Sequence, residues 1–230
     1  MIGVIGAMDK EIVHLLDRMD NMTQKTIADK EFYHGYISEK EVVVAKSGIG
    51  KVNATMTTVL LLSHWEISGV LNIGVAGGVR GCQIGDIVLA DGIVYSDASI
   101  ADIDDVPYGK MGNDPLIVPC DEKMLIAAKK ILETKNESHV SGIIASGDRF
   151  VTEMKYLAEI DQVVKNIVAC EMEGMAVAMT CYKFHVPFLS IRGISDMLEE
   201  KDQQEKYRVS VDEIAKRTSG FALDYLAENV

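Results

Sequence analysis

The chain has 230 residues, of which 48% are hydrophobic, and it carries a formal net charge of −12. Its length and apolar content suffice for one well-filled core, so we expect a single domain over residues 1–230 rather than a disordered chain. The acidic balance and the lack of a basic cluster argue against binding to nucleic acid or to an anionic membrane surface.

Short β-type runs alternate with helical patterns along the chain. Strands are predicted at 2–6, 31–37, 41–48, 69–78, 86–97, 141–148, 166–172 and 186–196, and helices at 10–19, 53–65, 121–133, 153–162, 173–184 and 210–228. Strands that alternate with helices indicate a largely parallel sheet covered by helices on both faces. The sequence therefore predicts an α/β fold. The irregular segment 98–119 has a length typical of functional or interfacial loops, the alternative being a disordered surface excursion.

Patterns that mark metal sites, disulfide frameworks or exported chains do not occur in the sequence. The four cysteines form no CxxC pair and the five histidines are scattered, so we expect neither disulfides nor a metal site. The first residues, MIGVIGAMDKEI, lack the basic and apolar regions of a signal peptide. No apolar run approaches the ~20 residues of a membrane span. We therefore expect a cytoplasmic protein without membrane association.

Polar residues gather where the predicted strands end. Ligands of parallel α/β sheets bind at the carboxyl ends of the strands. Carboxylates, glycines, an arginine and a phenylalanine follow these ends: Glu11, Gly77, Phe150, Glu171, Glu173, Arg192 and Asp196. Taken singly, each has an ordinary explanation, such as a solvated helix carboxylate for Glu11, a core side chain for Phe150, or a structural ion pair between Arg192 and Asp196. Together they predict one polar cleft.

The segment ACEMEGMAVA (169–178) places Glu171 and Glu173 among apolar residues. Burying a carboxylate without a partner costs several kcal/mol or more. Either the two acids occupy the first turn of a helix, where its dipole favours negative charge, or a cationic or hydroxyl-rich ligand meets them.

Seven motifs occur in the order and spacing of one superfamily: GAMDKEI, SGIGKVNA, NIGVAGG, GDIV, SGDRF, EMEG and RGISD. In these motifs the chain resembles the nucleoside phosphorylase/hydrolase superfamily, and within it the bacterial 5′-methylthioadenosine/S-adenosylhomocysteine nucleosidases, from residue 1 to about 228. The N-terminal GAM-x-x-E points to the hydrolases. The resemblance implies a three-layer α/β/α sandwich around a central mixed, largely parallel sheet, assembled as a homodimer and requiring no cofactor.

The resemblance also implies a role for each matching residue. Glu11 would deprotonate the attacking water, and Asp196 would protonate adenine at N7. Of the two acids in ACEMEGMAVA, Glu173 is then expected to be the functional residue and Glu171 a supporting residue at the strand end. The implied substrate-binding residues are Glu173 for the ribose hydroxyls, Met172 below the sugar, Phe150 and the Val151 backbone for adenine, Gly77 in the pocket wall, Arg192 and Ser195 as supports of the water and of Asp196, and Met8 and Ile49 at the sulfur end.

Three departures from the family pattern concern the 5′ side of the substrate. Val75 replaces the serine of the usual GSAGG, and Val211 stands where relatives place an aromatic residue. The acidic loop 98–119 is about one residue longer than in relatives, and its Ile100 is expected to provide the apolar contact with which a partner chain closes the 5′ pocket.

The implied reaction is hydrolysis of the N-glycosidic bond of 5′-methylthioadenosine and S-adenosylhomocysteine, which releases adenine in methionine salvage and nucleoside catabolism. A phosphorylase would need arginine and serine side chains to bind phosphate, and Asn72 and Val75 stand at two such positions. Hydrolysis of 6-amino-6-deoxyfutalosine and nucleoside binding without turnover are further alternatives. The presence of both Glu11 and Asp196 argues against mere binding, which needs no water-activating base.

Overall fold

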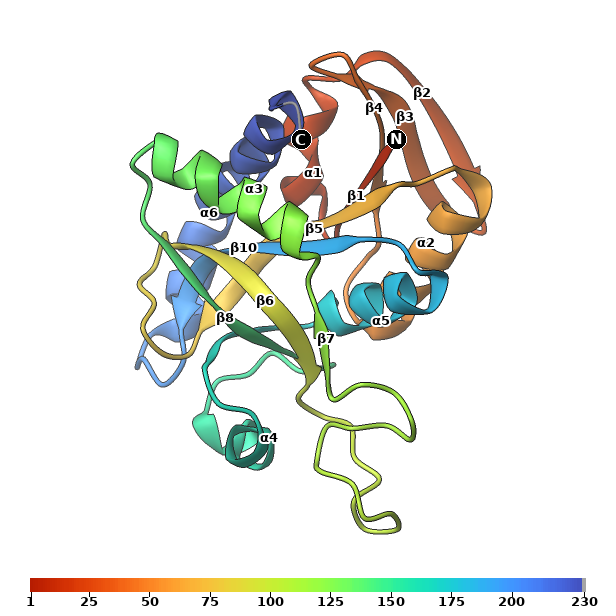
Figure 1. Ribbon diagram of the computed structural model, residues 1–230. Helices are drawn as coiled ribbons and strands as arrows, with labels where there is room; N and C mark the ends of the chain where they lie inside the picture. Colours follow the sequence, from red (N-terminus) through yellow and green to blue (C-terminus); the bar gives the residue numbers. More distant parts are fainter. Residues whose placement is uncertain (229–230) are drawn as a thin grey trace.

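The computed structural model describes residues 1–228 (Figure 1). Its elements, in chain order, are β1 (Ile2–Gly6), α1 (Asp9–Leu16), β2 (Asp20–Ile27), β3 (Lys30–Ile37), β4 (Lys40–Lys46), α2 (Lys51–His64), β5 (Gly69–Gly78), β6 (Ile87–Tyr95), β7 (Ile117–Pro119), α3 (Glu122–Thr134), β8 (His139–Ser146), a 3₁₀ turn (Met154–Tyr156), α4 (Ala158–Val163), β9 (Ile167–Glu171), α5 (Gly174–Phe184), β10 (Phe188–Met197) and α6 (Gln203–Ala227).

The strands form one mixed sheet in the order β10-β6-β8-β9-β5-β1-β4-β3-β2. Because β10 pairs with β5 as well as β6, the strands β5, β10, β6, β8 and β9 close into a ring of pairings. The prediction of a mixed sheet is confirmed. Parallel pairing is less dominant than expected, since within residues 1–228 five strand pairings are parallel and five antiparallel.

Helices cover both faces of this sheet, which confirms the three-layer architecture. Helices α1, α3 and α6 pack together on one face, and α2 packs against α5 on the other (Figure 1). Helix α1 turns the apolar side chains of Ile12 and Leu15 inward. Helix α5 is apolar on nearly all sides and is correspondingly buried along most of its length.

Some elements differ from the prediction for identifiable reasons. Strand β2 was not predicted, because its sequence DNMTQKTI lacks apolar alternation; it is an edge strand exposed along nearly its whole length. Helix α6 begins at Gln203, whereas the sequence predicts a start at residue 210. The prediction misses the first two turns because they are polar and show no apolar period. Within segment 98–119 only the short β7 is regular, and the rest projects from the body of the protein (Figure 1).

No helix within residues 1–228 is both long enough and apolar enough to span a membrane.

Candidate active site

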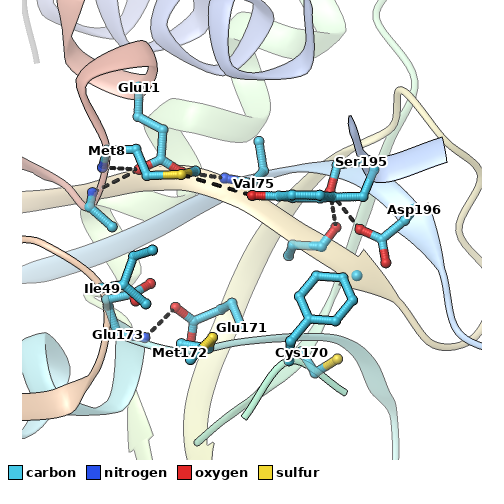
Figure 2. Close-up of a pocket in the computed structure, with 15 residues that line it drawn as sticks. Met8, Glu11, Ile49, Val75, Cys170, Glu171, Met172, Glu173, Ser195 and Asp196 are labelled. Atoms are coloured by element: carbon cyan, nitrogen blue, oxygen red, sulfur yellow. Dashed lines mark hydrogen bonds between the residues drawn. The ribbon is translucent and has the colours of Figure 1, made fainter. Parts of the chain in front are cut away.

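A cavity lies where the carboxyl ends of β1, β5, β9 and β10 meet (Figure 2). Its volume is about 470 Å³, including the part open to solvent. The residues that line it are Ala7, Met8, Glu11, Ile49, Val75, Ala76, Gly77, Phe150, Cys170, Glu171, Met172, Glu173, Ser195, Asp196 and Tyr207. Of the seven residues predicted to gather at the strand ends, six line this cavity and Arg192 does not.

Glu11 is held rigidly by backbone groups from two strand ends. It is the third residue of α1, and its Oε2 accepts hydrogen bonds from the backbone N–H groups of Ala7 (2.7 Å) and Met8 (2.9 Å). Its Oε1 accepts a third from Val75 (3.0 Å). A carboxylate offers about four lone-pair sites, so about one remains for a ligand.

Burial is the main influence on the pKa of Glu11, because only 1% of this residue is exposed to solvent. Burial raises its pKa, against the opposing effects of the Arg192 charge and the three backbone N–H groups. A carboxylate whose pKa lies above its ordinary value is a better proton acceptor near neutral pH. A carboxylate held in this way can act as a general base.

Asp196 lies at the end of β10 and is also buried. Its Oδ1 accepts a hydrogen bond from the Ser195 hydroxyl (2.7 Å), and its Oδ2 accepts one from Nε2 of Gln203 (2.7 Å). Burial raises its pKa, while these two hydrogen bonds lower it. A raised pKa keeps a carboxyl group available as a proton donor.

Glu173 forms the third carboxylate of the cavity wall. Its Oε1 accepts a hydrogen bond from the Gly50 backbone N–H (2.7 Å), which joins the start of α5 to the turn before α2. Burial, together with the nearby charge of Glu171, raises its pKa to about 7. The adjacent Met172 lines the same wall.

Glu171 has a partner that the sequence could not name. Its Oε2 lies 2.6 Å from Nη2 of Arg192, and both side chains are almost completely buried. The same oxygen accepts hydrogen bonds from the backbone N–H groups of Glu173 (3.0 Å) and Gly174 (2.7 Å). The alternative pairing of Arg192 with Asp196 is therefore wrong, and Glu171 has the supporting position expected of it.

Four predicted positions do not line the cavity: Arg192, Val211, Ile100 and Val151. Arg192 lies behind it and also donates to Asn72 Oδ1 (2.5 Å) and the Ile73 carbonyl (3.2 Å), so it cannot reach a bound molecule directly. Val211 is buried in α6, and Ile100 lies in the projecting loop. Val151 lines a recess of about 240 Å³ that shares Gly77, Phe150, Cys170, Glu171, Met172 and Asp196 with the cavity.

Tyr207 is an aromatic residue of the cavity wall that sequence reasoning missed. Its ring packs edge-on against Phe150, with 5.4 Å between ring centroids, and its hydroxyl lies 3.8 Å from Sδ of Met8. Position 207 is one helical turn before 211. Tyr207 lies before the predicted helix start at residue 210, and the polar first turns of α6 carry no apolar period that would reveal it.

Gly74 is a second residue that sequence reasoning missed. A side chain at this position would overlap both the Arg192 guanidinium and the Glu11 carboxylate. Glycine therefore allows the cation to approach the buried carboxylate from behind the strand. The GVAGG motif signalled a close approach, but not to which groups.

The charge of the cavity wall is of one sign. Its lining includes Glu11, Glu171, Glu173 and Asp196, and no lysine, arginine or histidine from the described residues. Residues 1–228 also contain no cluster of histidine, cysteine and acidic side chains arranged to hold a metal ion. Such a wall suits a ligand that is rich in N–H and O–H donors or that develops positive charge.

The whole chain is similar in sequence and structure to known nucleosidases. It matches the phosphorylase superfamily over residues 1–227. It is 35% identical to the 5′-methylthioadenosine/S-adenosylhomocysteine nucleosidase of Staphylococcus carnosus over 227 residues, which is 98% of this chain and 99% of the relative.

Solved structures agree with the sequence match. The S-adenosylhomocysteine nucleosidase of Streptococcus pyogenes, in complex with 5-methylthiotubericidin, superposes with a TM-score of 0.94 and 30% identity, covering 100% of this chain and 97% of that one. The 5′-methylthioadenosine/S-adenosylhomocysteine nucleosidase of Neisseria meningitidis, in complex with methylthio-immucillin-A, gives a TM-score of 0.92 and 30% identity over 98% of both chains.

Proposed function

The chain belongs to the phosphorylase superfamily, and from this premise we propose that it hydrolyses the N-glycosidic bond of 5′-methylthioadenosine and S-adenosylhomocysteine. The products are adenine and either 5-methylthioribose or S-ribosylhomocysteine. The proposal rests on one observation above all. Two buried carboxyl groups with raised pKa, Glu11 on α1 and Asp196 on β10, face one cavity (Figure 2).

In this proposal the two groups divide the proton transfers. Glu11 takes a proton from water as the water oxygen bonds to the anomeric carbon, while Asp196 gives a proton to N7 of the departing adenine. The bond from the anomeric carbon to N9 breaks and leaves its electron pair on the purine. General acid and base groups of this kind each contribute about 10²–10⁴-fold to the rate.

The remaining wall residues bind the nucleoside. Cleavage passes through a sugar with oxocarbenium character, and the carboxylate of Glu173 stabilises that positive charge and accepts from the ribose hydroxyls. Phe150 and the Val151 backbone bind adenine, Met172 packs below the sugar, and Gly77 forms the wall beside it. Ser195 orients Asp196, while Met8, Ile49, Val75 and Tyr207 surround the sulfur end.

The absence of a cation from the cavity wall favours hydrolysis over phosphorolysis. Phosphate binding relies on arginine or lysine donors. Within the described chain, Arg192 is committed to Glu171, Asn72 and Ile73 behind the wall. A phosphate dianion would instead face the carboxylates of Glu11 and Glu173, whose negative charge would repel it.

We further propose a cytoplasmic homodimer. Three apolar residues are largely exposed: Ile49 at the cavity (56%), Val52 in the first turn of α2 (80%) and Ile103 in the projecting loop (82%). Apolar side chains at the cavity mouth suit a partner chain whose 98–119 loop, with Ile100, closes the 5′ pocket. The four cysteines are free, which fits a reducing compartment.

The test is adenine release from 5′-methylthioadenosine, with and without phosphate. Release without phosphate supports the proposal, and Asp196→Asn provides the inactive control. Strict dependence on phosphate would contradict hydrolysis, and nucleoside binding without adenine release would favour a binding protein. S-Adenosylhomocysteine and 6-amino-6-deoxyfutalosine, assayed in parallel, rank the 5′ substituents.

A further inference from the structure

Gln203, the first residue of α6, contacts two of the groups to which the proposed function assigns the adenine base. Its Nε2 donates to Oδ2 of Asp196 (2.7 Å) and to the Val151 carbonyl (3.0 Å). The residue is only 4% exposed. It is not among the residues that line the cavity or the recess, so its carboxamide reaches both acceptors from behind the wall.

Other residues on the same face of α6 as Gln203 also contact residues of the cavity wall. Gln203, Tyr207 and Ser210 are spaced at i, i+4 and i+7, which places them on the same side of a helix. Tyr207 packs on Phe150, and the Ser210 hydroxyl donates to the Ser195 carbonyl (2.5 Å). The first two turns of α6 therefore touch the acid, the residue before it and the aromatic wall at once.

We propose that Gln203 is a positioning residue for the reaction, which sets the orientation of Asp196 and of the Val151 carbonyl toward the purine. The inference rests on the proposed function. One NH₂ group bridges the carboxylate and the carbonyl, so it fixes the separation of the two acceptors that adenine must meet. The Gln203 Oε1 atom has no hydrogen-bond partner in the described chain, so its NH₂ group is the polar part that is engaged.

The contact also acts on the proton of Asp196. Burial raises the pKa of this carboxyl, and the nearby charge of Glu200 raises it too, while the Gln203 and Ser195 hydrogen bonds lower it. The other titratable neighbours, Cys170 and Tyr207, themselves have raised pKa values and stay neutral near pH 7. Loss of the Gln203 donor therefore moves the pKa of Asp196 upward.

The test compares Gln203→Met with Gln204→Met in the full chain. Methionine keeps the length of the side chain without its donor, and Gln204 is the exposed neighbour in the same helical turn. For Gln203→Met we expect kcat/KM for 5′-methylthioadenosine to fall roughly 10- to 100-fold, the effect of losing one hydrogen bond to a charged group. The alkaline limb of its pH profile should move to higher pH, and adenine should bind more weakly by calorimetry. Gln204→Met should change none of these.

Gln203→Glu is a second variant of nearly the same shape. Its carboxyl group would lie beside Asp196, and the like-charge contact raises the pKa of the acid further, so the alkaline limb should again move to higher pH. An equal loss of kcat/KM at every pH, with an unmoved limb in both variants, would overturn the proposal. Tighter adenine binding in Gln203→Met would also overturn it, because the carboxamide would then compete with the purine. Failure of the wild type to bind or release adenine would instead contradict the proposed function.

Discussion

Arg192 and Glu171 form an ion pair, with 2.6 Å between Nη2 and Oε2, in which Glu171 belongs to the cavity wall and Arg192 lies behind it. It is the only ion pair within residues 1–228 whose two side chains are both nearly inaccessible to solvent. The guanidinium also opposes the upward pKa shifts of Glu11 and Glu173. One buried cation thus makes a cluster of buried carboxylates tolerable.

The first prediction is that Arg192→Met lowers the free energy of unfolding by about 3–5 kcal/mol, because it leaves the Glu171 charge buried and unpaired. Urea denaturation at neutral pH measures this loss. Adding Glu171→Gln should restore part of it, since glutamine removes the charge and still offers an oxygen to the N–H groups of Glu173 and Gly174.

The exposed pair of Arg80 and Asp161 provides a control for this prediction, because 51% of the Arg80 side chain is accessible. Arg80→Met should cost no more than about 1 kcal/mol, as expected for surface pairs in solvent. A similarly small cost for Arg192→Met would show that the buried pair contributes no more than a surface one.

The second prediction is that Glu11→Gln abolishes hydrolysis while adenine still binds. The amide cannot take a proton from water, so kcat should fall by about 10²–10⁴-fold. Its single oxygen also cannot serve all three N–H donors of Ala7, Met8 and Val75, and the free energy of unfolding should fall by about 1–3 kcal/mol. Steady-state kinetics and calorimetry with adenine separate the two effects, and equal losses of turnover and binding would indicate a binding role.

The third prediction is that Asp196→Asn abolishes turnover and leaves the fold intact. Asparagine has the size of aspartate, and its oxygen can still accept from Ser195 or Gln203, but it has no proton to give to N7. Adenine release measures the first part and thermal unfolding the second. Release at a near wild-type rate would show that another group supplies the proton.

Much of the cavity could be predicted from the sequence because its three central carboxylates follow from local patterns. Glu11, Glu173 and Asp196 each lie within a few residues of a strand end, and the carboxyl ends of neighbouring strands meet at one edge. The same locality explains the mixed α/β fold. Which residues follow a given strand is a property of the local sequence and does not depend on distant parts of the chain.

Pairings between distant segments could not be predicted in this way. The contact of Arg192 with Glu171 depends on β5 pairing with both β9 and β10, and sequence patterns do not fix strand order. The contribution of Tyr207 and Gln203 depends on where α6 begins, and the polar first turns of that helix carry no apolar period. Both gaps concern tertiary context rather than local propensity.

The fourth prediction is that Tyr207→Ala raises KM for 5′-methylthioadenosine about 10-fold, whereas Tyr207→Phe changes it little. Alanine removes the ring that packs on Phe150 and borders Met8, and aromatic pairs of this kind are worth about 0.5–1.5 kcal/mol beyond their buried area. Phenylalanine keeps the ring and loses only the hydroxyl. An unchanged KM in Tyr207→Ala would place the 5′ substituent away from this helix.

The fifth prediction concerns the pH dependence of stability and its origin in Glu173, whose pKa is raised from 4.5 to about 7. Between these two pH values the folded state holds a proton that the unfolded state has released, so the free energy of unfolding falls as pH rises. The contribution of Glu173 is at most about 3 kcal/mol, fully present below pH ~4.5 and lost above pH ~7. Glu11 and Asp196, whose pKa values are also raised, add slope of the same sign.

Glu173→Gln isolates this contribution, because its amide is neutral at every pH. Urea unfolding at pH 5 and pH 8 should show a smaller decrease for the variant than for the wild type, and the variant should gain stability relative to the wild type at pH 8. The exposed Glu205→Gln serves as the control and should keep the wild-type decrease. Equal decreases in Glu173→Gln and the wild type would contradict the raised pKa of Glu173. They would mean that the hydrogen bond from Gly50 offsets the free-energy cost of burying the charged carboxylate.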